Sequence, residues 1–257
     1  MSLPSEPYDV NFCFPVPDRL ESERVVLTPF VPSKHAQEFV DQALLYPEIF
    51  KYLPFGPFSS LTDFLSNLID SRVTPDPGYI LFAIYDKTRP SGDSEVESKS
   101  KSESESKHPE GALAGLIGLI NSSPANLVTE IGCVMILPPF QRTHVASNAV
   151  GLLLHYALNS KSPSPSLGLR KVVWQANALN KPSVRLAERM GFRLEGILKW
   201  DRVLPQGKDN AGNGGALREG DPMHGCVGRD TALLSLCWDE WEEGARERVD
   251  EIMRRVK

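Results

Sequence analysis

The chain has 257 residues, of which 41% are hydrophobic and 24% charged, so it can bury a sizeable core as one large domain or two small ones. Its formal net charge of −5 disfavours nucleic acid as the main partner and slightly favours cationic substrates such as amines. The four cysteines and five histidines show no metal-ligand spacing, no apolar run is long enough to cross a membrane, and the start lacks signal-peptide features. We therefore expect an intracellular protein of the cytoplasm or nucleus, without a metal and with neither a nucleic acid nor a membrane as partner.

The first part of the chain predicts an arm followed by strands and helices. Residues 1–21 are rich in proline, and we expect them to lie over the domain or to be loose. The domain itself is predicted to span 22–257. Hydrophobic spacing predicts its first elements at 24–30 (strand), 33–45 (helix, with Ser33 as N-cap), 59–73 (helix) and 79–85 (strand).

Two polar stretches are expected to be insertions in this domain. Residues 86–110 form a Ser/Glu/Lys tract without aromatic side chains, which cannot offset the entropy of folding. Because the tract lies between two predicted strands, we interpret it as an enlarged, disordered hairpin loop over about 87–110. The Gly-rich stretch 206–228 is interpreted as a second, mobile insertion.

The remaining elements alternate between strands and helices. The helix from Asn180 is well delimited, with Asn180 at its N-cap, Pro182 in its first turn and Gly191 as its stop. The tail is acidic and then basic, as the helix dipole prefers. We predict strands at 112–120, 129–136, 171–176, 193–205 and 231–238 and helices at 180–192 and 239–257, and we expect a further helix after the polar segment within 138–158. The order of elements predicts an α+β fold, or α/β in a loose sense, with one mixed sheet covered by helices.

A polar loop precedes a helix that is apolar nearly all the way round, in the stretch PPFQRTHVASNAVGLLLHYAL (138–158). The first N–H groups of a helix are unpaired and carry a partial positive charge, so they attract anions. The stretch therefore marks a candidate phosphate site, although the same residues could form only a solvated helix cap.

The order of elements and two motifs together resemble the GNAT superfamily of N-acetyltransferases. The motifs are the passage from TEIGCVMI through PPFQRTHVAS into a helix, and NALNKPSVRLAERMGFRLEGIL. Within the superfamily, the most similar branch is the one that contains the ribosomal-protein alanine acetyltransferases. The C-terminal stretch GRDTALLSLCWDEW also resembles the last strand and the ending of that branch. The resemblance spans about 22–241 and implies a mostly antiparallel mixed sheet and acetyl-CoA as cosubstrate.

The resemblance implies a coenzyme A site at the polar loop. The family pattern Gln/Arg-x-x-Gly-x-Gly/Ala, whose amides hold the pyrophosphate, falls here on Gln141, Arg142, Thr143, His144, Val145 and Ala146, followed by Ser147. His144 stands where the family usually has glycine, which matters because glycine permits a positive φ close to phosphate. We interpret the loop as a variant site, in which His144 tolerates that φ and adds a donor.

The resemblance also implies contacts to the pantetheine arm of the cofactor. The family pairs this arm with the main chain of the preceding strand, here Val134, Met135 and Ile136, as if it were an added strand. Asn177 and Asn180 are expected to bind the cofactor, and Asn180 also caps a helix. A plain core strand is compatible with the same sequence.

Two residues are candidates for the chemistry of amine acetylation. Ser183 matches the branch's serine near the sulfur and could donate a hydrogen bond to the leaving thiolate; it could also simply favour a first helical turn. Glu130 matches a glutamate of the branch and could act as the base if burial raised its pKa, or it could hold a loop. Gln175 cannot titrate, and Ala187 occupies the place of the tyrosine that many GNAT enzymes use.

The sequence thus predicts an N-acetyltransferase that transfers acetyl from acetyl-CoA to a primary amine by direct attack in a ternary complex. The acceptor is a protein N-terminal amine or a small-molecule amine, and the protein is a monomer or homodimer. A catalytically weak or inactive acyl-CoA-binding module is the alternative, suggested by His144 and Ala187. An interaction protein that uses the acidic tract and the tail is a third possibility. Cys133, inside an apolar strand, is expected to be an inert core residue.

Overall fold

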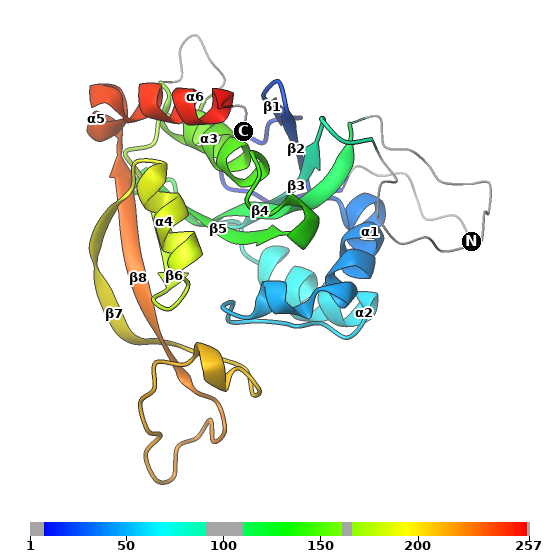
Figure 1. Ribbon diagram of the computed structural model, residues 1–257, viewed down its shortest axis with the longest axis vertical. Coiled ribbons are helices and arrows are strands. Elements are labelled where there is room, and N and C mark those ends of the chain that lie inside the picture. The colour runs from blue at the N-terminus through cyan, green and yellow to red at the C-terminus, as the bar shows by residue number, and fades with distance from the viewer. Residues whose placement is uncertain (1–7, 91–109, 161–165, 256–257) are drawn as a thin grey trace, which may run out of the picture.

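The computed structural model describes residues 8–90, 110–160 and 166–255 and places eight strands in one sheet, in the order β1-β2-β3-β4-β5-β6-β8-β7 (Figure 1). All neighbouring pairs are antiparallel except β5 and β6, which are parallel. The predicted mixed, mostly antiparallel sheet is confirmed. The strands are β1 (Leu20–Glu21), β2 (Val25–Pro29), β3 (Ile80–Asp86), β4 (Ala112–Ser123), β5 (Val128–Ile136), β6 (Lys171–Asn177), β7 (Arg193–Val203) and β8 (Gly228–Cys237).

Helices cover both faces of the sheet. They are α1 (Pro32–Leu45), η1 (Pro47–Phe50), α2 (Leu61–Phe64) with its π-helical continuation η2 (Leu65–Val73), η3 (Pro138–Phe140), α3 (Val145–Leu158), α4 (Lys181–Arg189), η4 (Asp209–Ala211), α5 (Trp238–Glu240), η5 (Trp241–Ala245) and α6 (Arg246–Arg254). Tyr85 and Asp86 are consecutive residues of β3, so their side chains point to opposite faces of the sheet. Their contacts show which helix covers which face. The Tyr85 ring packs on His35 of α1, whereas Asp86 contacts His144 at the start of α3.

The N-terminal part of the chain is held against the domain over its described residues. The amide of Cys13 donates to the carbonyl of Pro77, and Tyr156 of α3 donates to the carbonyl of Pro15. The last two residues of the predicted arm form β1, which pairs with β2 and which the sequence did not reveal. The arm is therefore laid over the domain from Val10 onward.

One helix start differs from the prediction. Helix α1 begins at Pro32 with Val31 at its N-cap, so the expected cap at Ser33 is wrong. Proline fits the first helical position because it lacks the N–H that would be unpaired there. The N–H of Val31 is instead paired with Nδ1 of the buried His35. By contrast, the cap at Asn180 is confirmed, since its side chain accepts from the amide of Ser183 at 3.3 Å.

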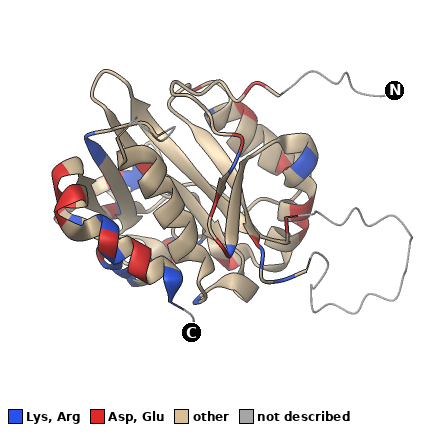
Figure 2. Cartoon of the chain, turned by 90° about the horizontal axis from the view of Figure 1, so that it is seen from above, with Lys and Arg blue, Asp and Glu red and all other residues tan. Residues whose placement is uncertain are grey.

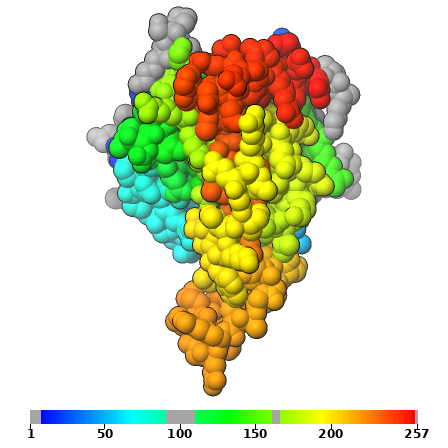
Figure 3. Space-filling model, turned by 90° about the vertical axis from the view of Figure 1, so that its left-hand side faces the viewer, coloured from blue at the N-terminus to red at the C-terminus, as the bar shows by residue number. Residues whose placement is uncertain are grey.

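The two predicted insertions have different outcomes. Strands β3 and β4 pair from Asp86 and Ala112 onward, as expected on either side of a hairpin loop, but residues 91–109 lie outside the described part of the chain. The insertion at 206–228 joins β7 to β8 and projects from the body (Figures 1 and 3). It is not a free loop throughout, because Lys208 and Ala211 near its start are buried.

The C-terminal helices close the face of the sheet that α3 covers. Helix α6 carries acidic and basic residues on its outer side (Figure 2) and packs on α3 through Val249 and Met253. A Cβ atom at Gly151 of α3 would lie 2.2 Å from the sulfur of Met253, so any larger residue at this position would force the Met253 side chain to move. His155 and Asp250 join the same two helices through a contact of 2.7 Å.

Gly151→Val should therefore destabilise the protein by about 2 kcal/mol through overpacking, measured as a lower melting temperature. Adding Met253→Ala in the same chain should restore part of the loss, because it removes the side chain that the valine would meet. A double variant no more stable than Gly151→Val would show that the contact between α3 and α6 is not the cause.

Candidate active site

The parallel strands β5 and β6 part after three residue pairs. Their register runs from Val128 opposite Lys171 to Glu130 opposite Val173 and then ends. Strand β6 stays paired with β8 on its other side as far as Asn177. Over 131–136, the side of β5 that faces β6 therefore has no strand partner among the described residues. The predicted cofactor residues Val134, Met135 and Ile136 lie in this part.

A β-bulge accompanies the parting of the strands. The register with β4 passes from Leu116 opposite Met135 to Gly118 opposite Gly132, so one residue of β4 faces two of β5. Within the bulge, Cys133 has a φ of 50°. A bulge bends its strand and changes the direction of its main-chain groups. Burial raises the pKa of the Cys133 thiol to about 12, so the thiol is neutral, in line with the predicted inert residue.

The polar loop at the end of β5 is braced by its own side chains. Gln141 Nε2 donates to the carbonyl oxygen of Ile136 at 2.9 Å, and Thr143 Oγ1 donates to that of Phe140 at 2.6 Å. The amide of Val145 in turn donates to Thr143 Oγ1 at 3.3 Å. These bonds fix the start of α3 at the open end of the gap between β5 and β6, where the first-turn amides of a helix can bind an anion.

The backbone conformation at His144 differs from the expectation. His144 has a φ of −68° and a ψ of −19°, so no positive φ is needed there, and the residue with positive φ is Arg142 at 59°. The glycine of the family pattern is thus replaced without strain. The His144 ring turns toward the end of β3, with Nε2 3.2 Å from Oδ1 of the buried Asp86.

An arginine that sequence reasoning missed lies beside the first turn of α3. Arg189 at the end of α4 donates from Nη2 to Ser147 Oγ at 3.0 Å. This contact brings a guanidinium group to the predicted phosphate loop. The ERMGF motif contains Arg189, but only the tertiary structure reveals that it contacts α3.

Glu130 is buried near the point where the strands part. Its side chain accepts two hydrogen bonds on Oε2, from Asn121 Nδ2 at 2.8 Å and from Gln175 Nε2 at 3.0 Å. Burial raises the pKa of Glu130 to about 7, against smaller lowering effects of the Asn121 hydrogen bond and two arginines. Asn121 was not predicted, because it belongs to β4 and reaches Glu130 only through strand pairing.

Ser183 lies on the other side of β6. Its Oγ accepts a hydrogen bond from Nε1 of the buried Trp174 at 3.1 Å, which leaves the hydroxyl hydrogen free to be donated elsewhere. Trp174 and Gln175 are consecutive residues, so they point to opposite faces of the sheet. Ser183 and Glu130, which they contact, therefore approach β6 from opposite faces. Ala187, one turn after Ser183, is fully buried.

Asn177 is engaged within the protein. Its Nδ2 donates to the carbonyl of Ala211 at 2.8 Å, and its Oδ1 accepts from the amide of Leu179 at 2.9 Å. The side chain is buried and holds the insertion against the end of β6. This geometry does not favour the expected contact between the Asn177 side chain and a cofactor.

A buried lysine ties the insertion to the segment after α1. Lys208 Nζ donates to the carbonyl oxygens of Phe50, Leu53 and Phe55 at 2.8, 2.7 and 2.6 Å. Burial lowers the pKa of Lys208 to about 8. Since η1 also packs against β5, the clamped segment forms a wall on the Glu130 side of the sheet.

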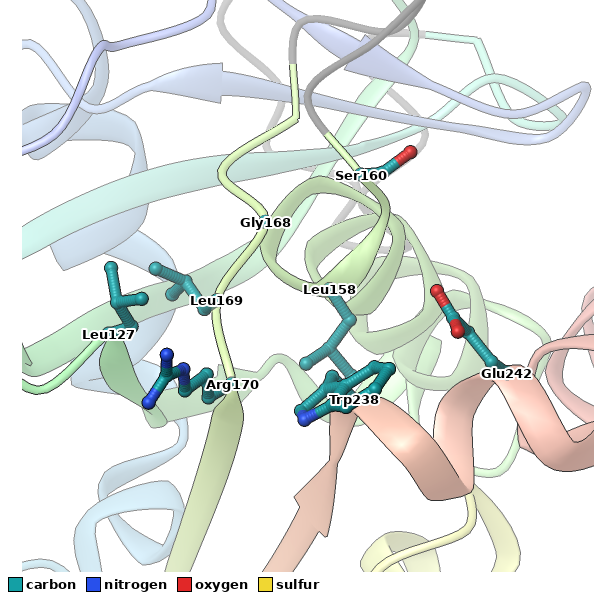
Figure 4. Close-up of a pocket in the computed structure, with 8 residues that line it drawn as sticks. All are labelled: Leu127, Leu158, Ser160, Gly168, Leu169, Arg170, Trp238 and Glu242. Carbon is teal, nitrogen blue, oxygen red and sulfur yellow. The ribbon is translucent and has the colours of Figure 1, made fainter.

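Other parts of the described chain contribute no second site of this kind. No group of three or more potential metal ligands occurs among the described residues, and none of their helices could span a membrane. A pocket of about 520 Å³ lies at the starts of β5 and β6, away from the polar loop, and contains none of the predicted site residues (Figure 4). It is lined by Leu127, Leu158, Ser160, Gly168, Leu169, Arg170, Trp238 and Glu242.

Comparison with known proteins assigns the class. Residues 24–193 match the model of the acetyltransferase (GNAT) domain, and the chain belongs to this family. No curated protein matches it. A GCN5-related N-acetyltransferase from Brucella melitensis is 25% identical, covering 93% of this chain and 87% of that one, with a TM-score of 0.67.

Two further solved structures share the fold. RimJ from Mycobacterium smegmatis, in complex with CoA-disulfide, is 17% identical with a TM-score of 0.58, over 90% of each chain. Spermidine N-acetyltransferase from Vibrio cholerae, in complex with CoA and spermine, is 16% identical with a TM-score of 0.56, over 86% of this chain and 99% of that one. The fold predicted from the sequence is that of these acetyltransferases.

The buried carboxyl of Glu130 should make stability depend on pH in a defined direction. Its folded-state pKa of about 7 lies above the ordinary value of 4.5, so its contribution to stability is present below the unfolded pKa and is lost as pH rises through 7. Glu130→Gln stays neutral, so it should gain about 2 kcal/mol relative to wild type between pH 5 and pH 8. Melting temperatures of both proteins across this range check the expectation, and parallel curves would contradict it.

Proposed function

We propose that this protein is an acetyl-CoA-dependent N-acetyltransferase that acetylates a primary amine by direct attack in a ternary complex. The acceptor is a protein N-terminal amine or a small-molecule amine. The observation that carries the proposal is the parting of β5 and β6 next to the start of α3, with Glu130 and Ser183 on opposite faces. GNAT family membership supports it, because CoA-bound neighbours share the fold.

In this proposal, the free edge of β5 and the polar loop hold the cofactor. The main chain of Val134, Met135 and Ile136 would pair with the amide groups of the pantetheine arm. The amides of the loop from Arg142 to Ser147, apart from that of Val145, which donates to Thr143 Oγ1, would bind the pyrophosphate at the start of α3. The amide of Gln141 donates to the carbonyl of Pro138, and Arg189 adds a positive charge at the loop. Bound acetyl-CoA supplies the activated acetyl group.

The two candidate catalytic residues then have separate tasks. Glu130, with its pKa near 7, takes a proton from the amine, directly or through water, so that the neutral amine can attack. The hydroxyl of Ser183 donates a hydrogen bond to the thiolate as it leaves. Asn121 and Gln175 hold one oxygen of Glu130, which leaves the other oxygen to accept the proton.

The alternative of an inactive acyl-CoA-binding module loses one of its two supports. Its first support was the missing glycine at His144, where the backbone is in fact helical and needs no glycine. The absence of a tyrosine at Ala187 stands, and the proposal assigns the thiolate to Ser183 instead. The ERMGF motif (188–192) and Ser183 before it also support membership of the branch that contains the ribosomal-protein alanine acetyltransferases.

Activity is tested by incubating the protein with acetyl-CoA and a panel of primary amines while free thiol is measured. We expect thiol release that depends on the amine, with kcat/KM falling as the pH drops below about 7, because Glu130 becomes protonated. Glu130→Gln should lower the rate on the order of a hundredfold and lose this acid limb. Acetyl-CoA that raises the melting temperature without any amine-dependent release would support the binding module instead.

Ser183→Ala separates catalysis from binding. A hydrogen bond to a developing negative charge is stronger in the transition state than in the ground state, so kcat should fall on the order of tenfold to a hundredfold. Acetyl-CoA affinity should change little. Because Ser183 lies in the first turn of α4, melting temperature and affinity are measured on the same variant, so that a loosened helix start is distinguished from a loss of catalysis. An unchanged kcat, or a defect in affinity alone, would exclude the assigned task.

A further inference from the structure

Two arginines face each other across the last two strands, at the base of the insertion. Arg202 of β7 is the direct register partner of Arg229 of β8. Like charges placed opposite one another destabilise a strand pair. One carboxylate serves both: Asp201 Oδ1 is 3.3 Å from Arg202 Nη1, and its Oδ2 is 3.9 Å from Arg229 Nη2. The net charge of the two arginines and the one aspartate is +1.

The two arginines differ in what they can offer a ligand. The side chain of Arg229 is 6% exposed, and its Nε and Nη2 both donate to Thr231 Oγ1, at 3.0 and 2.8 Å. The side chain of Arg202 is 43% exposed, and among the described residues its hydrogen bonds go only to the neighbouring Asp201. A guanidinium group has five donors, so Arg202 retains several for a bound anion.

The cluster of Arg202, Arg229 and Asp201 lies at the Glu130 side of the sheet. Arg229 Nη1 donates to the carbonyl of Tyr52 at 3.4 Å, and Tyr52 follows η1, which packs against β5, the strand of Glu130. Burial is the main cause of the raised pKa of Glu130, while Arg202 and Arg229 lower this pKa and Asp201 raises it as smaller effects. Leu233 of β8 is the partner of Gln175, which donates to Glu130, and Arg229 lies four residues before Leu233, so Arg229 and its partner Arg202 lie on the same face of the sheet as Glu130.

We propose that the acceptor is a primary amine that also carries a carboxylate, with the amine at Glu130 and the carboxylate on Arg202. This inference rests on the proposed function and names its substrate class. A carboxylate matches the planar guanidinium in a bidentate pair and neutralises the excess charge of the group. A polyamine would bring a second cation to the two arginines, and their repulsion disfavours it.

The test compares acceptors that differ only in the carboxylate. Acetyl-CoA turnover is measured with β-alanine and β-alaninamide, with 4-aminobutyrate and its amide, with a short peptide whose second residue is glutamate or glutamine, and with spermidine. We expect the carboxylate member of at least one pair to have a KM on the order of tenfold lower than its amide. The pair that shows this preference distinguishes a free amino acid from a peptide.

Arg202→Gln should remove the preference by raising the KM of the carboxylate substrate on the order of tenfold, while the KM of its amide stays the same. Comparing each variant with wild type on the same substrate cancels the different basicities of the two amines. Arg202→Lys should keep part of the preference. Arg218→Gln, which changes an exposed arginine in the outer part of the same insertion, should change neither KM.

Three outcomes would overturn the inference. Turnover that favours spermidine, or an Arg202→Gln effect that is equal for both members of every pair, would overturn it and leave the proposed acetyltransferase intact. Acetyl-CoA binding without transfer to any amine would overturn both proposals. A melting temperature measured on each variant excludes a loss of fold as the cause.

Discussion

The parting of β5 and β6 after Glu130 and Val173 is the feature on which the site depends. Main-chain donors and acceptors that are buried without a partner cost free energy, so strands in the middle of a sheet normally stay paired. Here a bulge at Cys133 turns β5, and Gly115 of β4 makes room, since a Cβ atom there would lie 2.0 Å from the carbonyl oxygen of Met135. A ligand that carries amide groups of its own, as the proposed pantetheine arm does, can complete this opening.

The same opening gives groups on both faces of the sheet access to one ligand. Closed sheets separate what lies on their two faces, whereas a gap between strands joins them. Trp174 and Gln175 are neighbours in sequence, but Trp174 donates a hydrogen bond to Ser183 on one face and Gln175 donates one to Glu130 on the other. The cofactor and the amine are thus expected to arrive from opposite sides, as a ternary complex requires.

The raised pKa of Glu130 follows from its burial and from the absence of a charge on its two hydrogen-bond donors. Asn121 and Gln175 donate to one oxygen of its carboxyl group but carry no positive charge to stabilise the ionised form, so burial dominates and the pKa rises. A directly bound arginine would have stabilised the carboxylate and made it a weaker base. The arginines of β7 and β8 act only at longer range, and this separation leaves Arg202 available for an anionic group of the acceptor.

The sequence by itself determined the class of fold and pointed to the residues of the candidate site. Hydrophobic spacing, the delimited helix from Asn180 and the loop before α3 depend on local interactions, which act between residues close in the chain. Glu130 and Ser183 could be singled out from their motifs, and Asn180 from its capping position. Even there, the local backbone at His144 was misjudged, because a family pattern indicates glycine without showing which residue of this loop takes the positive φ.

Only the tertiary structure decided which distant groups meet. The contacts of Asn121 with Glu130, of Arg189 with Ser147 and of Lys208 with the carbonyls after η1 join residues 9, 42 and more than 150 positions apart. No local preference encodes such pairs, since they follow from strand register and from the packing of helices on the sheet. The insertion at 206–228 illustrates the same point. Its composition predicts a loop, but only the tertiary structure reveals that the buried Lys208 and Ala211 anchor it to the domain.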